Sequence, residues 1–106
     1  MTTPEQQLTD FTDRVVVVTG GSRGLGQAMV EAFARCGADV VVASRKMDAC
    51  AKVAKEVSTA TGRRTLPVAC HVGDWAQCDA LTEAVYAEFG RCDVLVNNAG
   101  SSPLYP

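Results

Sequence analysis

The sequence predicts an α/β fold in which a parallel β-sheet lies between layers of helices. Four short apolar runs alternate with three segments whose apolar residues recur at helical spacing, and this alternation is typical of β-α-β units. The first run has valine at four consecutive positions, 15–18, which suits a parallel strand covered on both faces. It ends in a glycine-rich turn that leads directly into a helical segment.

The elements are expected in the order β-α-β-α-β-α-β. The expected strands are Arg14–Thr19, Asp39–Ala43, Thr65–Cys70 and Cys92–Val96. The expected helices are Leu25–Cys36, Asp48–Thr61 and a segment that begins after Asp74 and runs to Phe89. Each helix is followed by a glycine, the residue best suited to a left-handed helix stop: Gly37, Gly62 and Gly90.

Two residues refine this assignment. Pro67 has no amide hydrogen to donate, so the third strand is expected to be an outer strand of the sheet. Asp74 is expected to be the N-cap of the third helix, with Gln77 as its reciprocal partner three residues later.

Right-handed crossovers from the first strand outward predict the strand order 3-2-1-4. This is part of a Rossmann-type doubly wound sheet, with three layers in the order α/β/α. A binding crevice is expected at the carboxyl ends of the strands, beside the gap between strands 1 and 4. The unusual segments of the chain all follow strand ends, which favours a ligand over a separate structural explanation for each: Thr19–Gly26, Ser44–Lys46, His71-Val72 and Asn97–Gly100.

Composition narrows the class of protein. The 106 residues allow one domain, expected over residues 14–106, after a polar amino-terminal arm of residues 1–13. With 47% hydrophobic and 21% charged residues, the chain has the composition of a soluble globular domain. Its formal charge of −2 argues against nucleic acid or an anionic membrane as the main partner. The sequence has neither a membrane-spanning run nor a signal peptide, so the cytoplasm is the expected location.

The five cysteines are scattered, and none forms a C-x-x-C pair. Metal sites and disulfide frameworks need tighter or paired spacing, so no metal site is expected. All five are predicted to be small buried hydrophobic residues: Cys36, Cys50, Cys70, Cys78 and Cys92.

The glycine turn has the spacing Gly20-x-x-x-Gly24-x-Gly26. Glycine reaches positive φ without a clash and lets a ligand touch the backbone, and the helix that follows offers free N–H groups to a phosphate. A strand–helix turn without any ligand is the alternative if this segment is taken alone.

Thr19–Gly26 resembles the opening motif of the short-chain dehydrogenase/reductase family, and Asn97–Gly100 is similar to its second signature, N-N-A-G. The resemblance implies an oxidoreductase that passes hydride to or from a nicotinamide dinucleotide. In the family the second signature lies beside the ribose and nicotinamide and ties the fourth strand to the glycine turn. The cofactor-binding residues implied by these two motifs are Gly20, Ser22, Arg23, Gly24, Leu25, Gly26, Asn98, Ala99 and Gly100.

The end of the second strand bears on the choice of cofactor. An acidic residue there would accept hydrogen bonds from both ribose hydroxyls, whereas this chain has Ser44, Arg45 and Lys46. A hydroxyl and a guanidinium suit a 2′-phosphate, and Arg23 adds a second arginine on the same side. We therefore expect NADP rather than NAD, although solvated cations at a helix start are the alternative.

His71-Val72 follows the third strand, where the family usually has Asp-Val in contact with the adenine. Both residues are counted as cofactor-binding candidates. Whether His71 touches the adenine or only caps the adjoining helix stays open.

The family's catalytic Ser, Tyr-x-x-x-Lys and Asn have no counterparts here, so no catalytic residue is assigned. Tyr86 has Gly90 four residues later, and Tyr105 is next to the last residue. The chain is therefore expected to be the cofactor-binding half of a longer protein, inactive without its carboxyl-terminal half and homo-oligomeric when complete. The alternative is a non-catalytic nucleotide-binding module or sensor.

Overall fold

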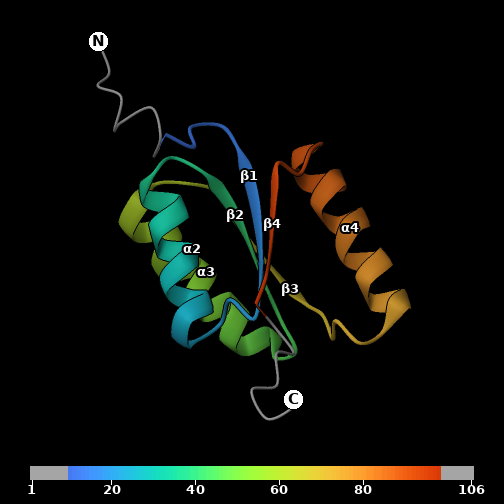
Figure 1. Cartoon of the computed structure of the whole chain (residues 1–106). Coiled ribbons are helices and arrows are strands. Elements are labelled where there is room, and N and C mark those ends of the chain that lie inside the picture. The colour runs from blue at the N-terminus through green and yellow to red at the C-terminus, as the bar shows by residue number, and fades with distance from the viewer. Residues whose placement is uncertain (1–9, 99–106) are drawn as a thin grey trace.

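The computed structural model describes residues 10–98, which form a parallel four-stranded sheet with helices on both faces (Figure 1). The strands are β1 (Val15–Thr19), β2 (Asp39–Ser44), β3 (Thr65–Ala69) and β4 (Val94–Asn97). The helices are α2 (Gly24–Arg35), α3 (Met47–Thr61) and α4 (Trp75–Phe89). The predicted α/β fold and its element order are confirmed.

The strands lie in the order β3-β2-β1-β4, as predicted. All three pairings are parallel, and Val16 of β1 is in register with Val40 of β2 and Val94 of β4. Pro67 lies in β3, an edge strand, so its missing amide hydrogen removes no bond from the interior of the sheet.

The core has two layers because alternate side chains of each strand point to opposite faces. On one face Val16, Val18, Val40 and Val42 pack against residues of α2 and α3. On the other face Val15, Val17 and Val41 pack against Leu81 and Val85 of α4. Figure 1 shows α2 and α3 on one side of the sheet and α4 on the other. This arrangement explains the consecutive valines, since each face needs its own apolar side chains.

The helix ends follow most of the predicted signals. Gly62 and Gly90 are left-handed C-caps, each with φ 74°, and Gly37 has φ 100° one residue beyond the cap of α2. Asp74 caps α4 by accepting from the N–H groups of Ala76 and Gln77.

The predicted role of Gln77 is wrong. Its Oε1 accepts from the His71 N–H at 2.8 Å, and its Nε2 donates to the Asp74 carboxylate at 3.3 Å. The Asp74 N–H instead donates to the His71 carbonyl at 2.9 Å. The chain before α4 folds back so that His71 supplies the acceptor that Gln77 was expected to provide.

The amino-terminal end of the described chain contacts the domain. The ring of Phe11 meets that of Phe33 edge to face, with centroids 5.1 Å apart, and the Phe11 N–H donates to the Cys36 carbonyl at 2.9 Å. The boundary at residue 13 stays a prediction, and residues 1–9 lie outside the described part of the chain.

The five cysteines are free thiols. Cys50 and Cys70 are buried as predicted, whereas Cys36, Cys78 and Cys92 are only half-buried. Within residues 10–98, no three His, Cys, Asp or Glu side chains come together as a metal site would require. None of the described helices is long and apolar enough to cross a bilayer.

Asp93 joins β4 to the start of β1. Its Oδ2 accepts from the Val15 N–H at 2.8 Å, and its Oδ1 contacts the guanidinium groups of Arg91 and Arg14. β4 begins at Val94 and not at the predicted Cys92. Just before it, the Asp93 N–H donates to the Val15 carbonyl at 2.9 Å, while the Val15 N–H donates to the Asp93 side chain and not to a backbone carbonyl. The Arg91 hydrogen bond, helped by the Val15 N–H, lowers the pKa of Asp93 below the ordinary value of an aspartate.

This lowered pKa predicts a pH dependence of stability. The unfolded chain takes up the proton first, so the contribution of Asp93 is complete above the pKa of an unfolded aspartate, about 3.9, and is lost as the pH falls through the lower folded value. Asp93→Asn should therefore destabilise the protein near neutral pH and flatten the acid limb of its stability curve. Urea unfolding measured between neutral pH and strong acid tests this. Asp79→Asn, on the exposed surface of α4, should keep the wild-type pH dependence.

Candidate functional site

The carboxyl edge of the sheet brings the predicted segments together. Thr19 at the end of β1 is in register with Ala43 of β2 and Asn97 of β4. The glycine turn after β1 therefore lies between Ser44 on one side and Asn98 on the other. This edge is the place where the sequence predicted a crevice.

The glycine turn is packed too tightly for side chains at one position. Gly20 and Gly24 have φ values of 68° and 58°, which glycine adopts without strain. At Gly26 a Cβ atom would lie 1.9 Å from the Gly20 carbonyl oxygen and 2.9 Å from Asn98 Nδ2. The first turn of α2 consequently lies directly on the backbone of the loop that precedes it.

Hydrogen bonds join the end of β1 and the glycine turn to the end of β4. The Thr19 hydroxyl oxygen accepts from the Asn98 N–H at 2.9 Å, and its own hydrogen can go to Asn97 Oδ1 at 3.1 Å or to the Val96 carbonyl at 3.3 Å. Asn98 Nδ2 donates to the Gly20 carbonyl at 3.4 Å. The tie between the fourth strand and the turn, which the resemblance implied, is present. Ala99 and Gly100 lie outside the described residues.

The amino terminus of α2 lacks the side-chain cap that α4 has. Arg23 is the N-cap residue but makes no side-chain cap bond, and the first turn contains no acidic residue. The first intrahelical bond of α2 runs from the Gln27 N–H to the Arg23 carbonyl. The N–H groups of the first turn, which come before Gln27, therefore have no acceptor within the helix. In α4 the Asp74 carboxylate occupies the corresponding position. The start of α2 is therefore suited to bind an anion such as a phosphate.

Three cations surround this edge. Arg23, Arg45 and Lys46 are exposed, and the ion pairs found within residues 10–98 include none of them. In contrast, four other arginines contact carboxylates: Arg14, Arg63, Arg64 and Arg91. The cations at the carboxyl edge are thus available to an external anion.

Ser44 and its neighbours form the far end of the site. Ser44 Oγ lies 2.9 Å from the buried Cys50 Sγ, and the Lys46 N–H points to the same hydroxyl at 3.4 Å. The sequence predicts Cys50 only as a small buried hydrophobic residue and gives no indication of this contact. Ser22 is half-buried, and Leu25 is 69% exposed, an unusual exposure for leucine.

His71 has both a local and a long-range contact. Its N–H donates to Gln77 Oε1 and its carbonyl accepts from the Asp74 N–H, so its backbone is bonded to the start of α4, where Asp74 is the N-cap. Its ring Nε2 also lies 3.1 Å from Arg45 Nη2, a contact that the sequence did not predict. Val72 is half-buried, with its carbonyl 3.4 Å from Cys78 Sγ.

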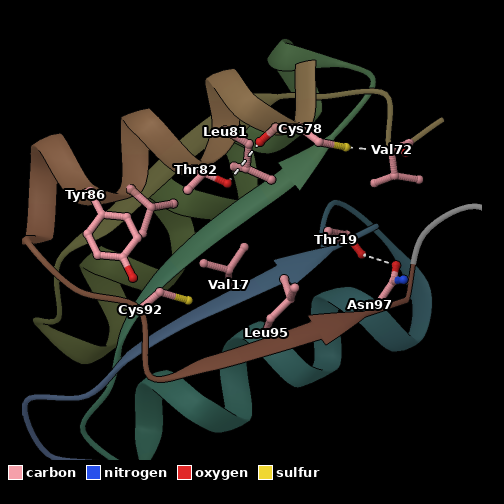
Figure 2. Close-up of a pocket in the computed structure, with 11 residues that line it drawn as sticks. Val17, Thr19, Val72, Cys78, Leu81, Thr82, Tyr86, Cys92, Leu95 and Asn97 are labelled. Carbon is pink, nitrogen blue, oxygen red and sulfur yellow. Dashed lines mark hydrogen bonds between the residues drawn. The ribbon is translucent and has the colours of Figure 1, made fainter. Parts of the chain in front are cut away.

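A groove of about 240 Å³ lies between α4 and the β1–β4 side of the sheet (Figure 2). Val72 is the predicted site residue in its lining, with Thr19 and Asn97 at the same end. Leu95 of β4 and Tyr86 of α4, which are 62% and 52% exposed, also line it. The groove is therefore mainly apolar and distinct from the start of α2.

Comparison with known proteins gives a consistent result. The sequence model of the family described as "short chain dehydrogenase" matches residues 14–106. The chain is 43% identical to the short chain dehydrogenase pigC of Monascus ruber, over 86% of this chain and 32% of that protein. L-sorbose reductase from Gluconobacter frateurii, solved with NADPH and L-sorbose, is 39% identical with a TM-score of 0.85, over 88% of this chain and 35% of that one. RhlG of Pseudomonas aeruginosa, solved with NADP, is 34% identical with a TM-score of 0.81, over 90% and 38%. The chain thus spans about a third of the length of these relatives.

The contact at Gly26 predicts a specific effect of substitution. Gly26→Ala should force the glycine turn away from α2, destabilising the protein by about 2–4 kcal/mol, since overpacked positions and backbone clashes have costs of this order. Gly62→Ala is the control, because a Cβ there meets nothing within 4 Å and only its φ of 74° is unfavourable. It should cost about 1 kcal/mol, the lower end of the range for a residue with a Cβ in the left-handed region. Equal losses in urea unfolding would contradict the packing argument.

Proposed function

The chain belongs to the short chain dehydrogenase family, and we propose that it is the cofactor-binding part of an NADP(H)-dependent oxidoreductase. The complete enzyme would transfer hydride between nicotinamide and a carbonyl or alcohol substrate. The observation that carries this proposal is the start of α2, which has no side-chain cap bond from its N-cap residue and lies against the glycine turn. At the same edge of the sheet, three cations lack carboxylate partners among the described residues.

The residues present suit a dinucleotide. Gly24 and Gly26 present no side chains at the start of α2, so a pyrophosphate can approach the N–H groups there. Asn98 holds the Gly20 carbonyl from the other side and keeps the turn in place. The nicotinamide supplies the hydride chemistry when it is bound. Ser22, Leu25, Val72, Ala99 and Gly100 are proposed as further contacts of this cofactor.

The second proposal is a preference for NADP over NAD. Arg45 and Lys46 follow β2, and the Ser44 hydroxyl lies beside them, where an adenosine ribose is expected. Arg23 adds a further positive charge from the glycine turn. A hydrogen bond from a charged group contributes about 1.5–3 kcal/mol, so one or two such contacts to a 2′-phosphate would decide between the cofactors. The NADPH and NADP in the two solved relatives support this preference.

The substrate chemistry would come from residues beyond this chain. Tyr86 lines the groove, but Gly90 stands where a Tyr-x-x-x-Lys motif has its lysine. We propose that a carboxyl-terminal half packs against the outer edge of β4 and the apolar groove, where it would cover Leu95 and Tyr86. A cytoplasmic location, a homo-oligomeric full-length enzyme and a domain boundary near residue 13 remain part of this proposal.

Cofactor preference is tested by isothermal titration of the protein with NADPH and NADH. We expect tighter binding of NADPH, and Arg45→Asp should weaken it about 10- to 100-fold, the factor equivalent to one charge-assisted hydrogen bond. NADH binding should stay the same or improve. Lys52→Asp, an equal charge change on the exposed surface of α3, should alter neither affinity by more than about twofold. Equal affinity of the wild-type protein for both cofactors would refute the NADP preference.

Activity separates the enzyme from its main alternative, a non-catalytic nucleotide-binding module. The 106-residue chain should bind NADPH but not oxidise it with any carbonyl substrate, because it contains no Tyr-x-x-x-Lys motif. Adding the carboxyl-terminal half should restore NADPH oxidation, followed by loss of absorbance of the reduced nicotinamide. Turnover by the isolated chain would contradict the proposed division of roles. Absence of turnover from the longer protein over a broad carbonyl panel would favour the binding module.

A further inference from the structure

A buried thiol contacts the hydroxyl group at the end of β2. Ser44 is the last residue of β2, and its Oγ lies 2.9 Å from Sγ of Cys50, a fully buried residue in the first turn of α3. We infer that Cys50 is a positioning residue for cofactor selection: its thiol holds the Ser44 hydroxyl where it can donate to a 2′-phosphate at the ribose end of the site. This inference rests on the proposed NADP(H) site and adds a residue that the predicted site does not include.

The Cys50 side chain is itself held from several directions. Its Sγ lies 3.7 Å from the Val68 carbonyl of β3 and 3.9 Å from the Ser44 carbonyl of β2. The Cys50 N–H donates to the Lys46 carbonyl at 3.1 Å, so the backbone belongs to the first turn of α3. The side chain also lies in the core cluster that contains Val53. A side chain packed in this way has little room to move, so it can fix a group that it contacts.

Ser44 is held through both its backbone and its side chain. Its carbonyl accepts from the Cys70 N–H at 2.7 Å, which ties the end of β2 to the end of β3. Its Oγ faces the Lys46 N–H at 3.4 Å in addition to Cys50 Sγ. A hydroxyl group that is already oriented loses less conformational freedom when a ligand binds than one that rotates freely. Removing the thiol should therefore weaken a ligand contact of Ser44 without touching the ligand.

The hydrogen-bonding capacity of Ser44 Oγ leaves room for a ligand. A hydroxyl group can accept two hydrogen bonds and donate one. Its oxygen can accept from the Lys46 N–H and from the Cys50 S–H at the same time, and its own hydrogen is then left for an external acceptor. A phosphate supplies such acceptors, and its charge strengthens the bond. The three bonds do not exclude one another.

The same contact is satisfied without a ligand. The Ser44 hydroxyl hydrogen can then turn to Cys50 Sγ, and the thiol hydrogen can turn to the Val68 carbonyl. The change needs only rotation about two single bonds, and no group gains or loses a proton. Because sulfur is a weak acceptor, the thiol competes little with a charged phosphate for the hydroxyl hydrogen.

The position of the Ser44 hydroxyl should matter more for NADPH than for NADH. A hydrogen bond to a 2′-phosphate is charge-assisted and roughly twice as strong as a neutral bond to a ribose hydroxyl. Loss of the Cys50 contact should therefore lower the affinity for NADPH more than the affinity for NADH. The measurable consequence is a smaller ratio of NADPH affinity to NADH affinity.

The experiment measures dissociation constants of NADPH and NADH for the full-length protein by isothermal titration. Cys50→Ala and Cys50→Val remove the thiol, and Cys50→Val also keeps the core filled. Each should weaken NADPH binding about threefold to tenfold, the factor equivalent to one neutral hydrogen bond. NADH affinity should change less than about twofold. Cys50→Ser, whose hydroxyl can still donate to Ser44 Oγ, should keep the wild-type ratio.

Val53→Ala is the matched control for the loss of a buried side chain. Val53 lies in the same helix and the same core cluster, and no hydrogen bond joins its side chain to Ser44. Val53→Ala should lower the free energy of unfolding in urea and leave the ratio of cofactor affinities unchanged. A fall in that ratio as large as the fall in Cys50→Ala would show an effect of core packing and overturn the inference.

A double-mutant cycle shows whether Cys50 acts through Ser44. Ser44→Ala should weaken NADPH binding about tenfold, and Cys50→Val should then have no further effect on the ratio. Equal losses from Cys50→Val in both backgrounds would overturn the inference. Failure of the wild-type protein to bind either nucleotide would refute the proposed function and this inference with it. A wild-type NADPH preference that Ser44→Ala reduces and Cys50→Val keeps would refute this inference alone.

Discussion

The carboxyl edge of the sheet depends on the close approach of α2 to the glycine turn. A methyl group at Gly26 would lie 1.9 Å from the Gly20 carbonyl oxygen, so backbone meets backbone without an intervening side chain. This approach directs the N–H groups of the helix start to the carboxyl edge of the sheet. The Thr19 hydroxyl and Asn98 hold the same turn from β4. The anion-binding character of the edge depends on this arrangement, because a displaced turn would move the helix start away from the neighbouring strand ends.

The charges of the described chain are arranged unevenly between the two ends of the sheet. At the amino end, Asp39 and Asp93 lie among the guanidinium groups of Arg63, Arg14 and Arg91. At the carboxyl end, Arg23, Arg45 and Lys46 have no carboxylate partner within residues 10–98. A chain with a formal charge of −2 thus carries three cations without carboxylate partners at this edge, and the overall charge alone would not indicate an anionic ligand.

The sequence predicted the sheet, its strand order and most helix ends, since these depend on periodicity, glycine stops and crossover handedness, which are local or general. It failed where side chains and backbone groups exchange hydrogen-bond roles. The Asp93 side chain accepts from the Val15 N–H ahead of β4, and the His71 carbonyl accepts from the Asp74 N–H in place of the Gln77 side chain. The contacts of Ser44 with Cys50 and of Arg45 with His71 were also missed, because packing brings these residues together and no spacing in the sequence indicates it.

The repeated valines of β1 have a consequence for strand alignment. A shift of one residue exchanges the two faces of a strand, and along Val15–Val18 such a shift would replace one valine by another. The burial of apolar side chains therefore discriminates poorly between the native alignment and alignments shifted by one residue. The hydrogen bonds at the two ends of the strand, from the Val15 N–H to the Asp93 carboxylate and from the Asn98 N–H to the Thr19 hydroxyl, are matched in only one alignment. The hydrophobic effect drives the association of these strands, and a few hydrogen bonds at their ends fix the register.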